Sequence, residues 1–184
     1  MRVLDQALLG ELEASWRAQG ADIAEILAPG LGDDAITALV GPLGLTLPEE
    51  ARIWWGWHDG VTEATANGWQ IGPSLGFYSL AEAVDEYRWI DDNMEERDFP
   101  RSWLPLTADE GGPLAVDCAA DPVVAPVKSI DFEVDIFPGG DSLGDVVELW
   151  IEAMSTGAWS WNPAGYWDRD LDRAPARASR MHVL

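Results

Sequence analysis

Two neighbouring side chains, His58 and Asp59, are the best candidates in this sequence for acid–base chemistry. A carboxylate that accepts a hydrogen bond from an imidazole can orient the ring so that it acts as a general base. Adjacent residues on a helix point in different directions, however, so the pair is poorly arranged for that role. The second histidine, His182, lies far away in the sequence. A hydrolase or sugar-binding enzyme that uses His58 and nearby carboxylates is therefore the least favoured class of function.

Paired carboxylates at Asp91–Asp92 and Glu95–Glu96 are candidates for binding a hard cation, because such cations prefer oxygen ligands. The pairs lack the regular ligand spacing and the bidentate final acid of a calcium loop. Two histidines and one cysteine also form no zinc-ligand pattern, and phosphate-binding, dinucleotide-binding and Gly-x-Ser-x-Gly motifs are absent. We expect no catalytic residue, no metal and no cofactor, and we expect that the protein is not an enzyme.

Negative charge dominates the composition, with 33 Asp and Glu against 11 Lys and Arg and a formal net charge of −22. Such a field repels nucleic acid and anionic membranes and attracts cationic partners. Plain solubility, or a salt-rich cell interior, is the alternative explanation. The acids concentrate at residues 85–98 and 131–141, and no Lys or Arg lies between Ser129 and Asp168. Because an unbalanced face repels itself, this distribution favours a partner-binding surface.

The predicted partner-binding surface combines acids of both stretches with one nearby tryptophan. Its residues are Trp69, Asp85, Asp91, Asp92, Glu95, Glu96, Asp98, Asp131, Glu133, Asp135 and Asp141.

Eleven tryptophans are available for the core or for binding. Five lie in apolar patterns and are expected in the core: Trp54, Trp57, Trp89, Trp103 and Trp150. Five others are less obviously internal: Trp55, Trp69, Trp159, Trp161 and Trp167. Exposed aromatic rings beside acids can anchor Arg and Lys side chains, and flat rings can also stack on sugars. The spacing does not choose between these uses.

The chain of 184 residues is long enough for one domain with a sizeable core, which we place at residues 1–167 with a helical extension at 1–30. No apolar run is long enough to span a membrane, and the first residues do not resemble a secretion signal. Cys118 is the single cysteine and is expected to be a small buried hydrophobic residue. These features predict a cytoplasmic protein, either a monomer or a homodimer.

The element that must position the His58–Asp59 segment is a helix within residues 47–60. Pro48 suits the first helical position, and the two glutamates after it favour the positive end of the helix dipole. Gly60 is expected to end the helix in a left-handed conformation. The predicted apolar face consists of Ile53, Trp54 and Trp57.

Periodicity and turn signals place the remaining elements. Helices are predicted at residues 5–18, 22–28, 33–40, 80–93 and 143–154, and strands at 69–72, 75–78, 103–106, 114–118 and 123–130. Residues 131–144 are expected to form a loop, with a short strand at 134–136. This order predicts an α+β fold with N-terminal helices, a central, mostly antiparallel sheet covered by helices on one face, and a C-terminal helix and tail.

The C-terminal residues 168–184 contain four arginines among acids, alanines and prolines. A flexible tail is the default expectation for such a segment. The alternative is an arm that docks on the acidic face of the chain itself.

Several motifs together resemble the SUKH superfamily (Smi/Knr-type), which includes the yeast cell-wall assembly regulator and many bacterial toxin-immunity proteins. A Leu-Pro opens the helix and an Asp-Gly follows it, and downstream segments at 77–83, 103–112 and 142–154 keep the order of the family. The resemblance covers roughly residues 30 to 160. The residues that carry it are Leu47, Pro48, Trp54, Trp57, Asp59, Gly60, Trp103 and Pro105.

This resemblance implies the fold and a broad role, but no individual contact residue. It implies an immunity protein that binds and neutralises a cognate toxin domain, often a nuclease. Charge independently favours a basic partner, such as the cleft of a nuclease. A non-enzymatic scaffold or regulator is the alternative, and it would use the same fold to bind cellular partners.

Overall fold

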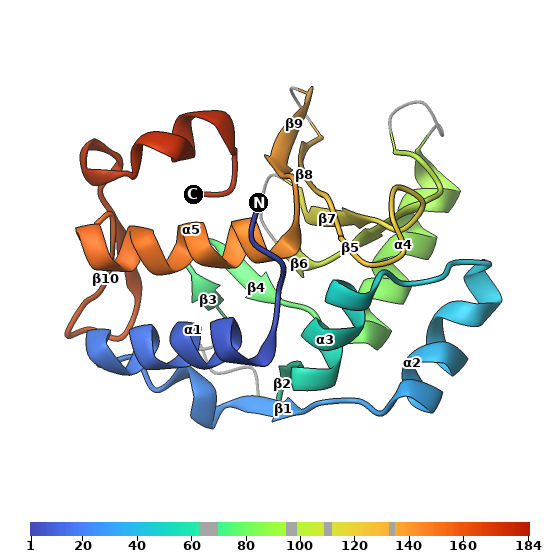
Figure 1. The fold of residues 1–184 in the computed structure, drawn as a ribbon, viewed down its shortest axis with the longest axis horizontal. Helices are drawn as coiled ribbons and strands as arrows, with labels where there is room; N and C mark the ends of the chain where they lie inside the picture. Colours follow the sequence, from blue (N-terminus) through green and yellow to red (C-terminus); the bar gives the residue numbers. More distant parts are fainter. Residues whose placement is uncertain (63–69, 95–98, 109–111, 133–134) are drawn as a thin grey trace.

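The computed structural model describes residues 1–62, 70–94, 99–108, 112–132 and 135–184 (Figure 1). The α+β class predicted from the sequence is confirmed. The α-helices in these residues are α1 (Gln6–Gln19), α2 (Asp33–Val40), α3 (Glu49–Trp57), α4 (Leu80–Asn93) and α5 (Leu143–Thr156). Four of them match the predicted ranges to within two residues, and α3 lies within the predicted 47–60 segment.

The strands form antiparallel sheets rather than one continuous central sheet. The largest sheet has the order β5-β7-β8-β9, and a second has the order β3-β4-β6. Two two-stranded sheets, β1-β2 and β10-β11, complete the described strands. Their bounds are β1 Leu27–Pro29, β2 His58–Val61, β3 Gln70–Gly72, β4 Leu75–Phe77, β5 Trp103–Pro105, β6 Thr107–Ala108, β7 Leu114–Asp117, β8 Val127–Asp131, β9 Asp135–Gly140, β10 Trp159–Trp161 and β11 Trp167–Arg169.

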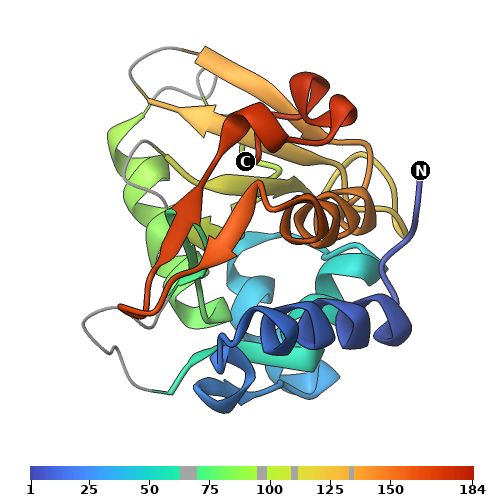
Figure 2. The same ribbon diagram turned by 90° about the vertical axis from the view of Figure 1, so that its left-hand side faces the viewer.

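Helices lie on both sides of the strands, rather than on one face of a central sheet as expected (Figures 1 and 2). Helix α4 packs against β5, whereas α1 and α5 pack against each other and α5 also contacts β9 and β10. No helix among the described residues is long and apolar enough to cross a membrane.

The structure differs from three local predictions and contains one strand pair that was not predicted. The expected helix at 22–28 is a short 3₁₀ turn at Ile23–Glu25, and β1 follows it because its residues pair with β2. The expected strand at 123–130 begins only at Val127. The carbonyls of Pro122 and Val123 instead accept hydrogen bonds from the first amides of α3. The expected loop at 131–144 contains the six-residue strand β9. The β10–β11 pair was not predicted.

Tryptophans occupy the core more widely than the sequence indicated. Trp54, Trp103 and Trp150 are buried as expected. Trp16, Trp55, Trp159 and Trp167 are buried as well, and Trp57 is partly buried. Trp89 is the exception, because 54% of its surface is exposed, so its assignment to the core was wrong. Its helix faces the core with other positions: Ala83, Val84, Tyr87 and Ile90.

Helix α3 differs from expectation at its start and in its buried face. Pro48 precedes the helix as its N-cap residue, with φ −55° and ψ 157°, rather than occupying its first position. Trp54 and Trp55 are fully buried, while Ile53 and Trp57 are only partly buried. Glu49 is exposed in the first turn, as a dipole partner should be, but Glu50 turns inward and is fully buried.

The Glu50 carboxylate accepts four backbone hydrogen bonds from distant parts of the chain. Oε1 accepts from the amides of Leu4 (2.6 Å) and Gly144 (3.1 Å). Oε2 accepts from Ala125 (2.6 Å) and Leu143 (3.3 Å). Two of these amides belong to the first turn of α5, where the helix dipole favours a negative charge. One carboxylate therefore joins α3, α5, the N-terminal segment and the 122–126 segment.

The N-terminal segment crosses the first turn of α5 at close range. A side-chain carbon at Gly144 would collide with the backbone of Arg2, Val3 and Leu4. Ser142 caps the helix by accepting from the Asp145 amide (3.0 Å) and donates to the Arg2 carbonyl (2.6 Å). The helix start and the chain start are therefore held as one unit.

Residues 171–184 lie on the chain itself and form contacts with α5. Arg177 donates to Glu148 and to Glu152, at 2.8 Å in each case. Val183 is buried, and its carbonyl accepts from the indole of Trp150 at 3.2 Å. In the structure this segment is a docked arm rather than a free tail.

We predict that Glu50→Gln lowers the free energy of unfolding by about 3 kcal/mol, because an amide nitrogen would face backbone donors and the charge at the α5 terminus would be lost. Urea denaturation followed by tryptophan fluorescence measures the change. Glu49→Gln, one residue away and exposed, is the matched control and should change stability by less than about 0.5 kcal/mol. Equal effects of the two variants would contradict the role assigned to Glu50.

Candidate functional site

The segment after α3 fixes the start of α4. Gly60 has a left-handed backbone (φ 74°), but it lies within β2 and not at the end of α3 as predicted. A side-chain carbon there would approach the Ser79 nitrogen to 2.6 Å. The Asp59 carboxylate accepts from the Leu80 amide at 2.7 Å, and Ser79 and Glu82 form a capping box. Asp59 and Gly60 therefore set the position of α4.

His58 and Asp59 do not form a catalytic pair. The Nδ1 atom of His58 lies 2.8 Å from the carbonyl of Ala28, in the strand beside it. Its Nε2 lies 3.8 Å from Glu13, which also accepts from the indole of Trp57 at 2.9 Å. Burial raises the pKa of the Asp59 carboxyl, while the hydrogen bond from α4 partly offsets that effect. Each side chain thus holds a different neighbouring element in place.

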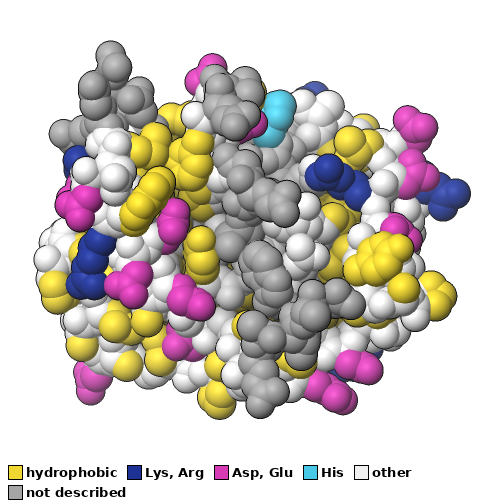
Figure 3. Space-filling model, turned by 180° about the vertical axis from the view of Figure 1, so that it is seen from behind, with side chains coloured by type: hydrophobic (Ala, Val, Ile, Leu, Met, Phe, Trp, Pro, Cys, Tyr) yellow, Lys and Arg dark blue, Asp and Glu magenta, His cyan; other side chains and the backbone are white. Residues whose placement is uncertain are grey.

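The outer face of α4 combines acids with an exposed aromatic ring. Asp85, Trp89 and Asp92 follow one another at i, i+4 and i+7, so they lie on one side of the helix. All three are exposed. In Figure 3, acidic and hydrophobic side chains lie next to each other on the side of the molecule where α4 runs. The apolar positions that α4 buries leave residue 89 outside the buried face, so helical periodicity is the signal that could have identified it.

Only part of this negative charge is neutralised. Asp85 pairs with Arg88 at 3.1 Å, and Asp91 forms an ion pair with Arg101. Asp92 has no ion pair among the described residues. The exposed Asp85–Arg88 pair contributes little energy, so a partner can compete for Asp85. With Asp92 unpaired as well in the described part of the chain, the face keeps an acidic character.

The second acidic stretch is a β-hairpin with acids at its two ends. Asp131 of β8 lies opposite Asp135 of β9, next to the turn. Asp141 follows the other end of β9, about 20 Å of strand away, and is exposed. The stretch is therefore not one compact patch, and Asp141 is separated from the hairpin acids.

A small hydrophobic cluster connects the two acidic regions. It contains Ile90 of α4, Ile130 of β8 and Trp103 of β5, and Ile136 of β9 packs against it. Because successive strand residues point to opposite faces, Asp131 points away from the face on which Ile130 packs against α4. The helix acids and the hairpin acids therefore lie on different faces of the largest sheet. The predicted Trp69, Glu95, Glu96, Asp98 and Glu133 lie outside the described residues.

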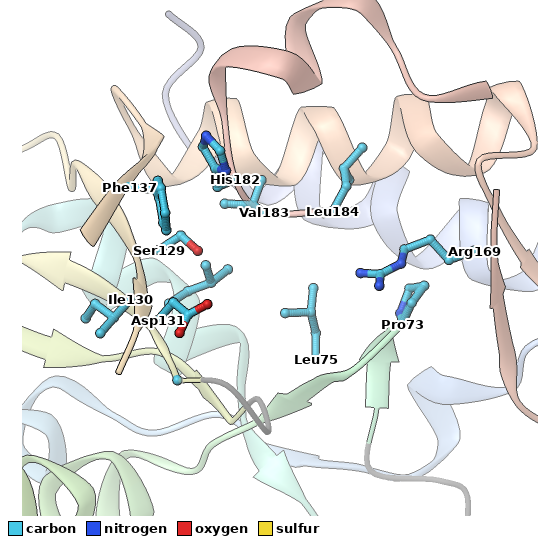
Figure 4. Close-up of a pocket in the computed structure, with 12 residues that line it drawn as sticks. Pro73, Leu75, Ser129, Ile130, Asp131, Phe137, Arg169, His182, Val183 and Leu184 are labelled. Carbon is cyan, nitrogen blue, oxygen red and sulfur yellow. The ribbon is translucent and has the colours of Figure 1, made fainter. Parts of the chain in front are cut away.

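A cavity of about 200 Å³ opens beside the hairpin (Figure 4). Asp131 and Arg169 point into it from opposite sides, and His182 and Phe137 form its upper wall with their rings stacked 4.4 Å apart. The rest of the lining is mainly apolar: Pro73, Leu75, Gly112, Leu114, Ser129, Ile130, Val183 and Leu184. Asp131 is the one lining residue that was predicted as a binding residue, because Arg169 and His182 belong to the C-terminal segment.

Metal-ligating and nucleophilic groups are not assembled in the described part of the chain. No group of three or more His, Cys, Asp or Glu side chains there could hold a metal ion. Cys118 is partly buried, and burial, with help from the Asp117 charge, raises the pKa of its thiol to about 12. Such a thiol remains protonated at neutral pH and is a poor nucleophile.

Comparison with known families matches residues 30–148 to the SMI1 / KNR4 family (SUKH-1). The matched span holds the α3 helix, the Asp59–Gly60 connection, α4 and the largest sheet. The chain therefore belongs to the SMI1 / KNR4 family, as the resemblance in its motifs indicated. Domains of this family are often immunity proteins, and they are generally non-enzymatic. No curated protein matches the chain.

The family motif residues are structural in this fold. Leu47, Pro48, Trp54 and Trp103 are buried, and Trp57 is partly buried. Pro105 lies in β5, opposite Ala115 of β7. Because β5 is an edge strand of the largest sheet, it tolerates proline.

We predict that Gly60→Ala lowers the free energy of unfolding by about 3 kcal/mol, because the added carbon strains a left-handed backbone and presses on the cap of α4. Gly10→Ala is the matched control. It places the same carbon in open space on α1 and should raise stability by about 0.5–1 kcal/mol. Thermal and urea unfolding of both variants measure the difference, and a neutral Gly60→Ala would refute the proposed packing.

Proposed function

We propose that this protein is an immunity-type protein that binds a cognate basic toxin domain and neutralises it. We further propose that the toxin is a nuclease, whose cleft must carry positive charge to bind a polyanion. Membership of a family whose domains are often immunity proteins supports the general role. The observation that carries the specific proposal is the exposed Trp89 between two acids on α4.

Charge supports fast and selective association with such a toxin. The net charge of −22 attracts a basic surface over a long range and repels the nucleic acid that competes for it. Steering of this kind raises association rates above the ordinary values of about 10⁵–10⁷ M⁻¹s⁻¹. We propose that the helix acids Asp85, Asp91 and Asp92 and the hairpin acids Asp131 and Asp135 supply the contact charge. We propose the same role for Asp141 and for the predicted residues outside the described ranges: Trp69, Glu95, Glu96, Asp98 and Glu133.

Trp89 supports tight binding once the partner has arrived. Its ring exposes a large apolar area, and an arginine or lysine of the toxin can stack on it while pairing with Asp85 or Asp92. Tryptophans at the centre of an interface often dominate its energy. The cavity beside Asp131 offers room for one side chain of the partner next to the hairpin acids.

A pull-down from a lysate of the source organism, with low-salt and high-salt washes, would identify the partner. We expect one basic protein with a toxin domain, whose capture weakens at high salt. Several housekeeping proteins without such a domain would favour a scaffold or regulatory role instead.

With the purified partner, we predict that Trp89→Ala increases the dissociation rate about tenfold, and that Asp85→Asn/Asp92→Asn mainly slows association. Asp22→Asn/Glu25→Gln is the matched control, since it removes two exposed charges from a different part of the chain. Surface plasmon resonance at two salt concentrations separates the rates. Loss of affinity in the control equal to that in the α4 variant would refute the assignment of the surface.

A further inference from the structure

The C-terminal segment forms a strap over the acidic face of α5, where the strap is residues 170–181. Figure 2 shows this segment beside α5 and near β9. One end is fixed because it follows β11, and the other is fixed because Val183 is buried in the core. The His182 amide also donates to the carbonyl of Pro138 in β9 at 3.0 Å. The strap is thus held at both ends, and its middle crosses α5.

The middle of the strap contacts α5 through one arginine. The Nε and Nη1 atoms of Arg177 reach Glu152 and Glu148, two acids one turn apart on the helix. A guanidinium can bridge two carboxylates in this way, whereas an ammonium presents one point charge. Among the described residues, Glu152 forms an ion pair with Arg177, and Glu148 forms ion pairs with Arg177 and Arg2. Displacement of the strap from α5 would leave Glu152 without an ion-pair partner among the described residues.

The strap packs on the core only through partly buried side chains, namely Ala174, Ala178 and Met181. Its two 3₁₀ turns, Leu171–Arg173 and Ala176–Arg180, contain no buried residue. Cavities of about 390 Å³ and 570 Å³ border it, one among the strap residues and one between Arg177, Arg180, Met181 and the β8–β9 strands. The apolar contacts that oppose its displacement are those of these partly buried side chains, and Arg177 is itself partly exposed to competing solutes.

We propose that the strap is an internal competitor for a second partner-binding face on α5, which accepts an arginine-bearing segment of a basic protein. The proposal rests on the proposed function, because the basic toxin would supply that segment. In the free protein Arg177 occupies Glu148 and Glu152. When the partner binds, a partner arginine takes this place and residues 170–181 move away from the helix. Such a strap admits partners that present a guanidinium at this position and holds the acidic face closed against weaker cations.

The test uses the full chain and needs no toxin. The probe is a blocked, fluorescently labelled peptide with the sequence of residues 171–181, and fluorescence anisotropy gives its dissociation constant. Because Arg177→Ala removes the internal competitor, we expect the peptide to bind this variant about fivefold more tightly than the wild type. Adding Glu148→Gln/Glu152→Gln should abolish the gain, whereas adding Asp22→Asn/Glu25→Gln should preserve it.

A purely structural role for Arg177 predicts no gain of binding. Equal binding to wild type and Arg177→Ala, or a gain that survives Glu148→Gln/Glu152→Gln, would overturn the proposal. Circular dichroism checks that each variant is folded. Arg177→Lys keeps the positive charge but loses the forked guanidinium, so we expect a smaller gain in peptide binding, of about twofold. Failure of this experiment would leave the α4 surface unaffected, and failure of the α4 variants would not change the peptide result.

Discussion

The structure depends on one buried carboxylate. Glu50 brings four backbone amides from separate parts of the chain to a single point and places a negative charge at the N-terminus of α5. A fully buried acid is costly unless its oxygens are well hydrogen-bonded, and here both of them are. Because α5 is held at this point, the N-terminal segment, the 122–126 segment and the following C-terminal strap all acquire fixed positions relative to α3.

A second constraint fixes the position of the candidate binding surface relative to α3. Asp59 and Gly60 leave α3 and hold the first turn of α4. The inner face of α4 then packs on the largest sheet, which leaves Asp85, Trp89 and Asp92 outside. The residues of the family motif thus build and orient the surface without being part of it. Contact residues can vary on such a scaffold while the buried link between α3 and α4 stays the same.

Much of the fold could be predicted from the sequence, because the main helices and several strands have strong periodicity and clear caps, as at Ser79 and Ser142. What failed depended on long-range contacts. In the sequence Glu50 looks like an ordinary first-turn acid. Its central role depends on hydrogen bonds from three segments that are distant along the chain. Trp89 looked apolar by type, although helical periodicity placed it outside. Phe137, Arg169 and His182 meet in one cavity because β9 and the C-terminal segment lie side by side, which no local pattern encodes.

The central claim is that the acidic face of α4 contacts a basic partner through Trp89. Hydroxyl-radical footprinting of the chain, alone and with its captured partner, tests this contact directly. The account predicts that oxidation of Trp89 falls sharply in the complex, while Tyr166, which is 49% exposed in the β10–β11 connection, is oxidised as before. Unchanged oxidation of Trp89 in a saturated complex would contradict it.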